Sequence, residues 1–348
     1  SGSVERYEAA RAVVVATGTS AAMPPIEGLA EAGVWDSRDV TSAKEVPRRL
    51  LVIGGGVVGV EMAQAWKTLG AEEVTVVELF DRLLAREEPE AGTELRRSFE
   101  KMGIGVYTDA RTEKIERQGP GGPVAAHVAL EGGSVQVIEA DEVLVATGRH
   151  PNTDHLGLDS VGLEPGGFIE VDDHLQATGV AGGWLYAVGD VNGRSLLTHT
   201  GKYQARIAGA HIAGADTRAW GDQKATPRVV FTNPKVAAVG LIEQQARDAG
   251  LSVRTVTYDI GHIAGAATLG RGYHGTAKLV VDADRGVIVG ATFVGPTAGE
   301  LLHAATVSIV ADVPLDTLWH AVPSFPILSE VWLRLLETYR DEFGHEFL

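Results

Sequence analysis

A glycine-rich turn between an apolar run and an apolar helix constrains this chain more than any other feature. Residues 50–53 are predicted to form a buried strand, and a helix is predicted to run from the turn to Leu69, where Gly70 ends it. The pattern G-x-G-x-x-G lies between them, and its site residues are Gly54, Gly56, Val57, Val58 and Gly59. The first glycine permits a tight bend, the second lets a diphosphate approach the backbone, and the third lets helix pack on strand. Since the helix N-terminus favours anions, this stretch predicts a dinucleotide site.

An acidic residue supports this prediction. Residues 74–77 form a second apolar run that ends in Glu78. A carboxylate about 20 positions beyond such glycines binds a ribose hydroxyl, and it repels the 2′-phosphate of NADP. We therefore expect NAD to be preferred over NADP.

The composition excludes several classes of function. With 348 residues and 45% hydrophobic content, the chain can form two or three domains. A net charge of −16 argues against a nucleic-acid partner. No apolar run of membrane length and no signal peptide are recognisable, which predicts no membrane partner and a cytoplasmic protein. There is no cysteine, so this chain supplies no disulfide, thiolate metal site or cysteine nucleophile. No metal ligand and no catalytic side chain are identified.

Apolar periodicity and turn residues predict the remaining elements. The predicted strands are a buried one at 12–18, then 104–107, 112–130 with a turn at 119–123, 142–149, 185–190, and strands within 226–239 and 276–294. The predicted helices are 89–102, 201–212, 297–310 and 329–339. The motif Val-Ala-Thr-Gly occurs at 15–18 and again at 145–148, which indicates two related nucleotide-binding units.

Five ordered motifs resemble the flavoprotein pyridine nucleotide–disulfide oxidoreductases, a family that includes dihydrolipoamide dehydrogenase and mercuric reductase. The motifs are Ala-Thr-Gly at 16–18 with Pro-Pro-Ile-Glu-Gly at 24–28, the glycine turn, Ala-Thr-Gly-Arg at 146–149, Tyr-Ala-Val-Gly-Asp at 186–190, and the segment 227–241. The resemblance implies an α/β fold, with a Rossmann-like NAD domain, a partial FAD domain in three layers and an α+β dimerisation domain. The implied boundaries are 1–39 for an FAD-domain remnant and linker, 40–150 for the NAD domain, 151–222 for the second FAD part and 223–348 for dimerisation.

The resemblance also implies further cofactor-binding residues. Those for FAD and the neighbouring nicotinamide are Thr17, Gly18, Glu61, Gly148, Arg149, Gly189, Asp190, Leu197, Thr198 and His199. Asp190 would bind the flavin ribityl chain, although a carboxylate in this position also forms turns. Glu61 would lie near the nicotinamide, or else serve as an acidic residue in the first turns of its helix. For His199 a structural role is the alternative.

Two departures from the family pattern affect the expected function. The family's first flavin-binding turn and redox cysteines have no counterpart here, so we expect a fragment that is colourless and inactive alone. The family's disulfide reductases also carry His-Pro followed by a glutamate near the C-terminus, whereas Val322 precedes Pro323 here and Glu330 follows later. Valine cannot exchange a proton. His320, two residues away, is expected to be structural.

The expected function is therefore an FAD-dependent NAD(P)H oxidoreductase that passes hydride from nicotinamide to flavin and on to a small-molecule acceptor such as a quinone. The alternatives are dihydrolipoamide dehydrogenase or a related disulfide reductase, and a non-catalytic NAD-binding protein. A homodimer is expected through residues from about 223 onward, since the apolar runs within 301–310 and 331–336 exceed the needs of one small domain.

Overall fold

The protein is described for residues 5–344 by a computed structural model, and it divides into two compact units. The first unit combines the described residues up to Ser20 with Arg149–Thr226. The second combines Ala21–Gly148 with the described residues from Pro227 on. The chain therefore passes from one unit to the other three times. Parallel and antiparallel sheets occur together with helices, which confirms the α/β class.

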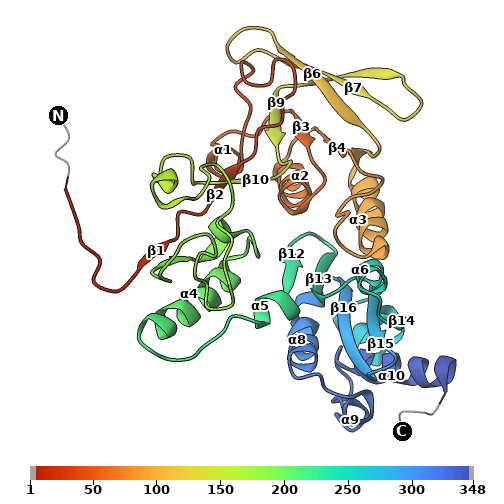
Figure 1. The fold of residues 1–348 in the computed structure, drawn as a ribbon. Helices are drawn as coiled ribbons and strands as arrows, with labels where there is room; N and C mark the ends of the chain where they lie inside the picture. The colour runs from red at the N-terminus through yellow and green to blue at the C-terminus, as the bar shows by residue number, and fades with distance from the viewer. Residues whose placement is uncertain (1–4, 345–348) are drawn as a thin grey trace. The chain divides into compact units, whose positions relative to one another are not determined.

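The N-terminal part of the second unit is built on a four-stranded parallel sheet (Figure 1). Its strands, in the spatial order β5-β4-β3-β9, are β5 (Ile104–Tyr107), β4 (Glu73–Val77), β3 (Arg49–Ile53) and β9 (Glu142–Val145). Ile53 at the end of β3 is in register with Val77 on one side and Val145 on the other. The carboxyl ends of these strands thus share one edge. Because the chain order reverses between β3 and β9, this edge is a switch point, where open α/β sheets bind ligands.

Strand β3 is buried on both faces, because alternate residues enter different cores. Leu50 and Val52 pack with helices α2 and α3, whereas Leu51 and Ile53 pack with a three-stranded antiparallel sheet. The elements of these outer layers are α2 (Val57–Leu69), α3 (Pro89–Met102), β6 (Arg111–Arg117), β7 (Val124–Ala129) and β8 (Val135–Ala140). The continuous apolar run in the sequence is typical of such a doubly covered parallel strand.

The C-terminal part of the second unit is a five-stranded antiparallel sheet covered by helices. Its strands, in the order β12-β13-β16-β15-β14, are β12 (Arg228–Val230), β13 (Lys235–Gly240), β16 (Val287–Gly295), β15 (Thr276–Asp282) and β14 (Val253–Asp259). Helix α8 (Leu302–Val310) packs on β16 and β13, and α10 (Glu330–Phe343) packs on β14 and β15. The expectation that their apolar runs form a dimer surface is wrong for most of these side chains. Leu301, Leu302, Ile309, Val331, Leu335 and Leu336 are buried within this chain.

The first unit contains two short strand pairs and a helix. Strand β1 (Val13–Val15) runs parallel to β11 (Leu185–Ala187), and β2 (Thr19–Ala21) pairs with β10 (Arg149–Pro151). The 3-10 turn η2 (Gly189–Asn192) follows β11, and α4 (Thr198–Ile212) comes next. The predicted burial of the first strand is wrong: Val13 is 40% exposed and Val14 is 44% exposed. The reason is that, within the described residues, β11 is the one strand beside β1.

Short elements complete both units. The α-helices are α1 (Asp39–Ser42), α5 (Gly221–Lys224), α6 (Glu243–Asp248), α7 (Ala264–Leu269) and α9 (Leu315–Trp319), and the 3-10 helices are η1 (Leu158–Val161), η3 (Ile260–His262) and η4 (Ala298–Leu301). Among residues 5–344, no helix combines the length and the apolar character that crossing a membrane requires.

Candidate functional site

The glycine turn between β3 and α2 shows three different steric requirements. Gly54 has a φ of +108°, and a Cβ there would lie 2.5 Å from the carbonyl oxygen of Ala146. A Cβ on Gly59 would lie 1.9 Å from the carbonyl oxygen of Gly54. A Cβ on Gly56 would meet no atom within 4 Å. The turn is therefore closed at its first and third glycines and open at the second, where α2 begins. A diphosphate approaching the free N–H groups of a helix needs this opening.

Glu78 is fixed beside this turn. Only 7% of the residue is exposed, and its carboxylate accepts hydrogen bonds from the backbone N–H groups of Gly55 and, at 2.8 Å, Phe80. A Cβ on Gly55 would lie 2.9 Å from Oε2 of Glu78. Gly55 is not among the predicted site residues, because the second position of the motif accepts any residue in the general pattern. In this chain Gly55 lets the carboxylate approach the turn.

The second Val-Ala-Thr-Gly motif lies at the same edge of the sheet. Ala146 follows β9, and its N–H donates to the carbonyl oxygen of Ile53 at 2.8 Å. Two residues later, the carbonyl oxygen of Gly148 accepts a hydrogen bond of 3.0 Å from Ala22. The structure thus brings this motif and the glycine turn together, as expected for two strands that flank a switch point.

Glu61 lies on α2 and connects the helix to the C-terminal sheet. Its Oε1 accepts a hydrogen bond of 2.7 Å from the backbone N–H of Phe231, directly after β12. Burial raises the pKa of Glu61, and this hydrogen bond offsets part of the increase. The structure therefore gives Glu61 a structural partner within the second unit, and its role near the nicotinamide stays a prediction.

In the first unit, Asp190 lies in a chain of polar contacts. Its Oδ2 accepts a hydrogen bond of 2.9 Å from the hydroxyl of Thr19, which is buried. The same hydroxyl accepts from Nε of Arg149 at 2.9 Å, and Nη2 of Arg149 donates to the Thr19 carbonyl oxygen at 2.7 Å. Arg149 thus acts on Asp190 through Thr19. Thr19 is not among the predicted site residues, because its partners are more than a hundred residues away along the chain.

The Thr17–Gly18 turn belongs to the same unit. Gly18 has a φ of +70°, the left-handed region that favours glycine. Its carbonyl oxygen accepts from the backbone N–H of Asn152 at 3.0 Å, and the carbonyl oxygen of Thr17 accepts from the side-chain amide of Asn152 at 2.9 Å. The motif after β1 is therefore tied to the segment that follows Arg149.

The start of α4 lies against the turn that bears Asp190. Leu197 is the N-cap residue, and Thr198 and His199 begin the helix with exposed side chains. A Cβ on Gly201 would lie only 3.2 Å from the Cα of Gly189. This close approach brings the predicted residues 189, 190 and 197–199 into one neighbourhood. A carboxylate, backbone groups and a helix start are the kinds of group that hold a flavin and its ribityl chain.

In the C-terminal segment, the residue directly before each of its two prolines cannot exchange a proton. Val322, which precedes Pro323, is 85% exposed, and Phe325, which precedes the second proline, is 74% exposed. Both of these side chains are apolar. Glu330 is buried, and its Oε1 accepts from Nη2 of Arg334 at 2.7 Å. The described geometry therefore pairs Glu330 with an arginine. Within residues 5–344, no group of three or more His, Cys, Asp or Glu side chains could hold a metal ion.

A parallel sheet with an open glycine turn at its switch point, and a carboxylate fixed beside that turn, define a dinucleotide-binding α/β protein. The comparisons with known proteins agree. The chain belongs to the pyridine nucleotide-disulphide oxidoreductase family, which it matches over residues 2–215. Residues 226–335 match the dimerisation domain of that family. The family resemblance is thereby confirmed.

Relatives in this family include dehydrogenases and reductases. The chain is 36% identical over 343 residues to a dihydrolipoyl dehydrogenase of Thermus scotoductus. This match covers 97% of the present chain and 71% of that protein. It is 33% identical to a mercuric reductase of Staphylococcus aureus, and this match covers 92% of the present chain and 57% of the mercuric reductase. Among solved structures, the Cu(II) complex of the HOCl-induced flavoprotein disulfide reductase RclA from Escherichia coli is similar, with a TM-score of 0.81 and 26% identity. That match covers 93% of this chain and 73% of the RclA chain.

Proposed function

We propose that this chain acts in an FAD-dependent oxidoreductase that takes its electrons from NADH. The observation that carries the proposal is the glycine turn, which is open at Gly56 and has the Glu78 carboxylate fixed beside it. FAD and a pyridine nucleotide are the cofactors that family membership implies, and when bound they supply the hydride-transfer chemistry.

The residues of the chain have separate roles in this proposal. The N–H groups at the start of α2 bind the diphosphate of NADH, and Glu78 accepts a hydrogen bond from its adenosine ribose. In the first unit, Asp190 accepts hydrogen bonds from the ribityl hydroxyls of FAD. Thr19 orients this carboxylate, and Arg149 orients Thr19.

A disulfide is the acceptor that the comparisons favour. The relatives are named dihydrolipoyl dehydrogenase and mercuric reductase, and a similar structure is that of a disulfide reductase. These names support the alternative of a disulfide reductase better than the main expectation from the sequence, which was a small-molecule acceptor such as a quinone. The chain supplies no cysteine, so any thiol that carries electrons to a disulfide comes from outside these 348 residues.

A quinone-type acceptor remains the second candidate because of one observation. Val322 and Phe325 place exposed apolar side chains before the two prolines, where the family's disulfide reductases carry an acid/base histidine. Thiol chemistry needs a proton donor at this point, whereas reduction of a quinone by flavin does not require one from this segment.

The experiment titrates the purified chain with NADH and with FAD. Because this chain has no thiol to reduce a disulfide, NADH oxidation with lipoamide and with benzoquinone is then measured on the FAD-loaded polypeptide that the gene encodes. We expect micromolar NADH binding, and weak FAD binding by the chain alone. Failure to bind NADH would refute the proposal. Stoichiometric FAD in the purified chain would contradict the expectation that these residues bind flavin weakly. Turnover of benzoquinone without turnover of lipoamide would favour the second candidate.

A further inference from the structure

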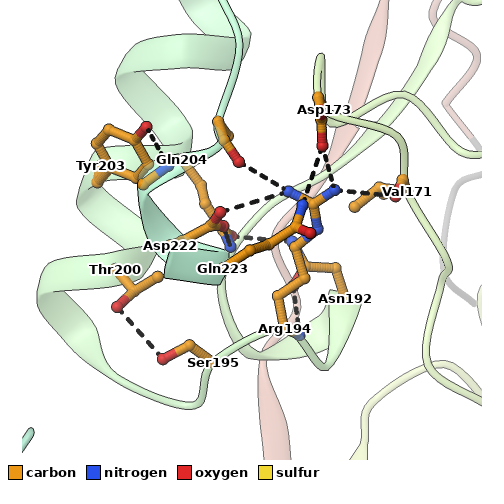
Figure 2. Close-up of polar contacts among 12 residues, drawn as sticks. Val171, Asp173, Asn192, Arg194, Ser195, Thr200, Tyr203, Gln204, Asp222 and Gln223 are labelled. Carbon is orange, nitrogen blue, oxygen red and sulfur yellow. Dashed lines mark hydrogen bonds and ion pairs between the residues drawn. The ribbon is translucent and has the colours of Figure 1, made fainter. Parts of the chain in front are cut away.

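A fully buried amide holds the turn that bears Asp190. Oε1 of Gln204, on α4, accepts hydrogen bonds from the backbone N–H of Gly189 at 2.8 Å and from Nδ2 of Asn192 at 2.9 Å. Its Nε2 donates to Oδ2 of Asp222 at 2.7 Å (Figure 2). Since two donors face one end of the amide and a carboxylate faces the other, only one orientation of Gln204 satisfies all three groups.

Asp222 is buried as well, and its charge is compensated by Arg194. The side chain of Asp222 is 0% exposed, and Nη1 of Arg194 lies 3.5 Å from its Oδ1 (Figure 2). Arg194 also donates to the carbonyl oxygens of Val171, Asp172 and Ala219. A buried carboxylate is tolerated only when it is paired and hydrogen-bonded, and here both conditions are met.

Asn192 closes the network at the far end of the turn. Its Nδ2 donates to the carbonyl oxygen of Ala187 at the end of β11, and its Oδ1 accepts from the backbone N–H of Arg194 at 3.0 Å. The turn η2 is thus held at Gly189, at Asn192 and directly beyond its end. Asp190 lies between these fixed points, and its side chain is the part of the turn that the network leaves to other partners.

We propose that Gln204 and Asp222 are positioning residues, which keep η2 in the conformation that presents the Asp190 carboxylate to the ribityl chain of FAD. The inference rests on the proposed function, since it assigns Asp190 to flavin. A leucine would fill the space of Gln204 without the cost of burying an amide and a carboxylate. A fully satisfied polar network instead specifies one geometry, which is the property a cofactor-binding turn needs.

The first test is amide hydrogen exchange at Gly189 in the 348-residue chain, without any cofactor. Gln204→Leu removes the acceptor of this N–H, and we expect its exchange to become about tenfold faster. Tyr203→Phe is the matched control, because it alters the neighbouring residue and removes only a hydroxyl that accepts from Gly221. Its Gly189 exchange should equal that of the wild type. Equal exchange in Gln204→Leu and the wild type would overturn the inference.

A paired exchange of groups keeps the test valid if Gln204→Leu does not fold. Gln204→Glu places two buried carboxylates next to each other. Their repulsion should loosen the turn and speed amide exchange at Gly189. In the double variant Gln204→Glu/Asp222→Asn, the introduced amide donates to the introduced carboxylate, so the hydrogen bond reverses while the net charge is kept. Gly189 protection should return to within about twofold of the wild type. A double variant that is no better protected than Gln204→Glu would refute the network.

FAD titration of the same variants, followed by flavin fluorescence, tests the link to the cofactor. The dissociation constant should rise about tenfold in Gln204→Glu, recover in the double variant and stay unchanged in Tyr203→Phe. Altered Gly189 exchange with unaltered FAD affinity would refute the positioning role. An FAD affinity that Asp190→Ala leaves unchanged would instead refute the flavin part of the proposed function, and the exchange data would still decide whether the network holds the turn.

Discussion

Gly56 and Gly59 belong to one turn but have opposite surroundings, and this difference gives a test at the scale of single residues. Gly56→Ala places its Cβ in open space, so the free energy of unfolding should not change, while the Cβ obstructs the diphosphate. We expect NADH affinity to fall at least about tenfold, since charge-assisted hydrogen bonds to the turn are lost. Gly59→Ala should instead cost about 1–3 kcal/mol of stability, because its Cβ would overlap the Gly54 carbonyl oxygen.

Thermal melting and NADH titration of the two variants check this prediction. If Gly56→Ala binds NADH as well as the wild type, the diphosphate does not approach this turn. If Gly59→Ala melts at the wild-type temperature, the helix and strand are less closely packed than the structure shows.

Glu78 provides the test of nucleotide specificity. Glu78→Ala should weaken NADH binding by about 1–2 kcal/mol, since a hydrogen bond to a charged group is lost. NADPH binding should weaken less or improve, because the carboxylate no longer repels the 2′-phosphate. Glu73→Ala, on an exposed position of the same strand, is the control and should change neither affinity. Wild-type protein that binds NADPH as tightly as NADH would contradict the predicted preference.

At this scale, sequence patterns identify residues whose role depends on close neighbours along the chain. Gly54, Gly56 and Gly59 form one local motif, and Glu78 follows the next strand. Thr19 and Gln204 could not be identified in this way. Thr19 joins residues that follow β9 and β11, and Gln204 is an ordinary polar residue of a helix until the fold brings Asp222 to it.

At the scale of elements, periodicity predicts segments that are long or apolar. Helix α3 begins at Pro89 and ends before Gly103, as the sequence predicts, and β5 has the predicted bounds. Strands β8 and β14 were not predicted. The residues of β14 are largely polar, and β8 is mostly exposed although it contains several apolar residues. The predicted helix at 297–310 begins with the 3-10 turn η4, so α8 starts only at Leu302.

A buried ion-pair cluster joins α3 to the C-terminal sheet, and we expect it to stabilise this contact between elements. Lys278 on β15 lies 2.9 Å from Glu88, 3.2 Å from Glu90 and 2.9 Å from Glu243. Lys278→Met should lower the free energy of unfolding by about 3–5 kcal/mol, since Glu88 would be left buried and unpaired. Lys114→Met removes a half-buried surface lysine whose two carboxylate partners are exposed, and as the control it should cost less than about 1 kcal/mol. If urea unfolding shows that both variants lose a similar amount of unfolding free energy, the prediction is contradicted.

The same cluster predicts how stability depends on pH. Burial alone lowers the pKa of Lys278, but the hydrogen bonds that Lys278 donates to Glu88 and Glu243 outweigh it and raise the pKa above 10.5. The contribution of Lys278 is therefore complete below that pH and is lost only in stronger base. Arg247 and then Lys278 lower the pKa of Glu243, so its contribution is present above pH 4.5 and is lost as acid protonates it. Urea unfolding of the wild type and of Lys278→Met between pH 3 and 8 measures this pH dependence. The difference between their free energies of unfolding should become smaller in acid.

At the scale of the whole molecule, we predict a homodimer through the dimerisation domain. Most of the side chains first expected at the interface lie in the core, whereas Val322 and Phe325 are exposed in the single chain. Phe325→Glu should shift the molecular mass in light scattering from dimer towards monomer, because an interface excludes an unpaired charge. Leu69→Glu, which also replaces an exposed apolar residue, should stay dimeric. A monomeric wild type at micromolar concentration would disprove the dimer.

The motifs in their order predicted the family and the α/β class of the whole molecule, because each motif is local. The motifs do not predict, however, which distant segments group into one compact unit. Residues 5–20 join 149–226 through the pairing of β1 with β11, and no local pattern encodes that partner. The domain boundaries expected from the sequence, at residues 39, 150 and 222, therefore stay predictions.

The pairing of β1 with β11 also sets an order of events during synthesis. Val13 leaves the ribosome about 170 residues before its partner Leu185, which at typical translation speeds means a delay of about 10–35 s. During this interval residues 21–148 can complete the parallel sheet, whereas the apolar β1 waits for β11, its partner strand among the described residues. Nascent chains halted shortly before residue 185 should therefore expose β1 to chaperones and proteases, and chains released after α4 should not.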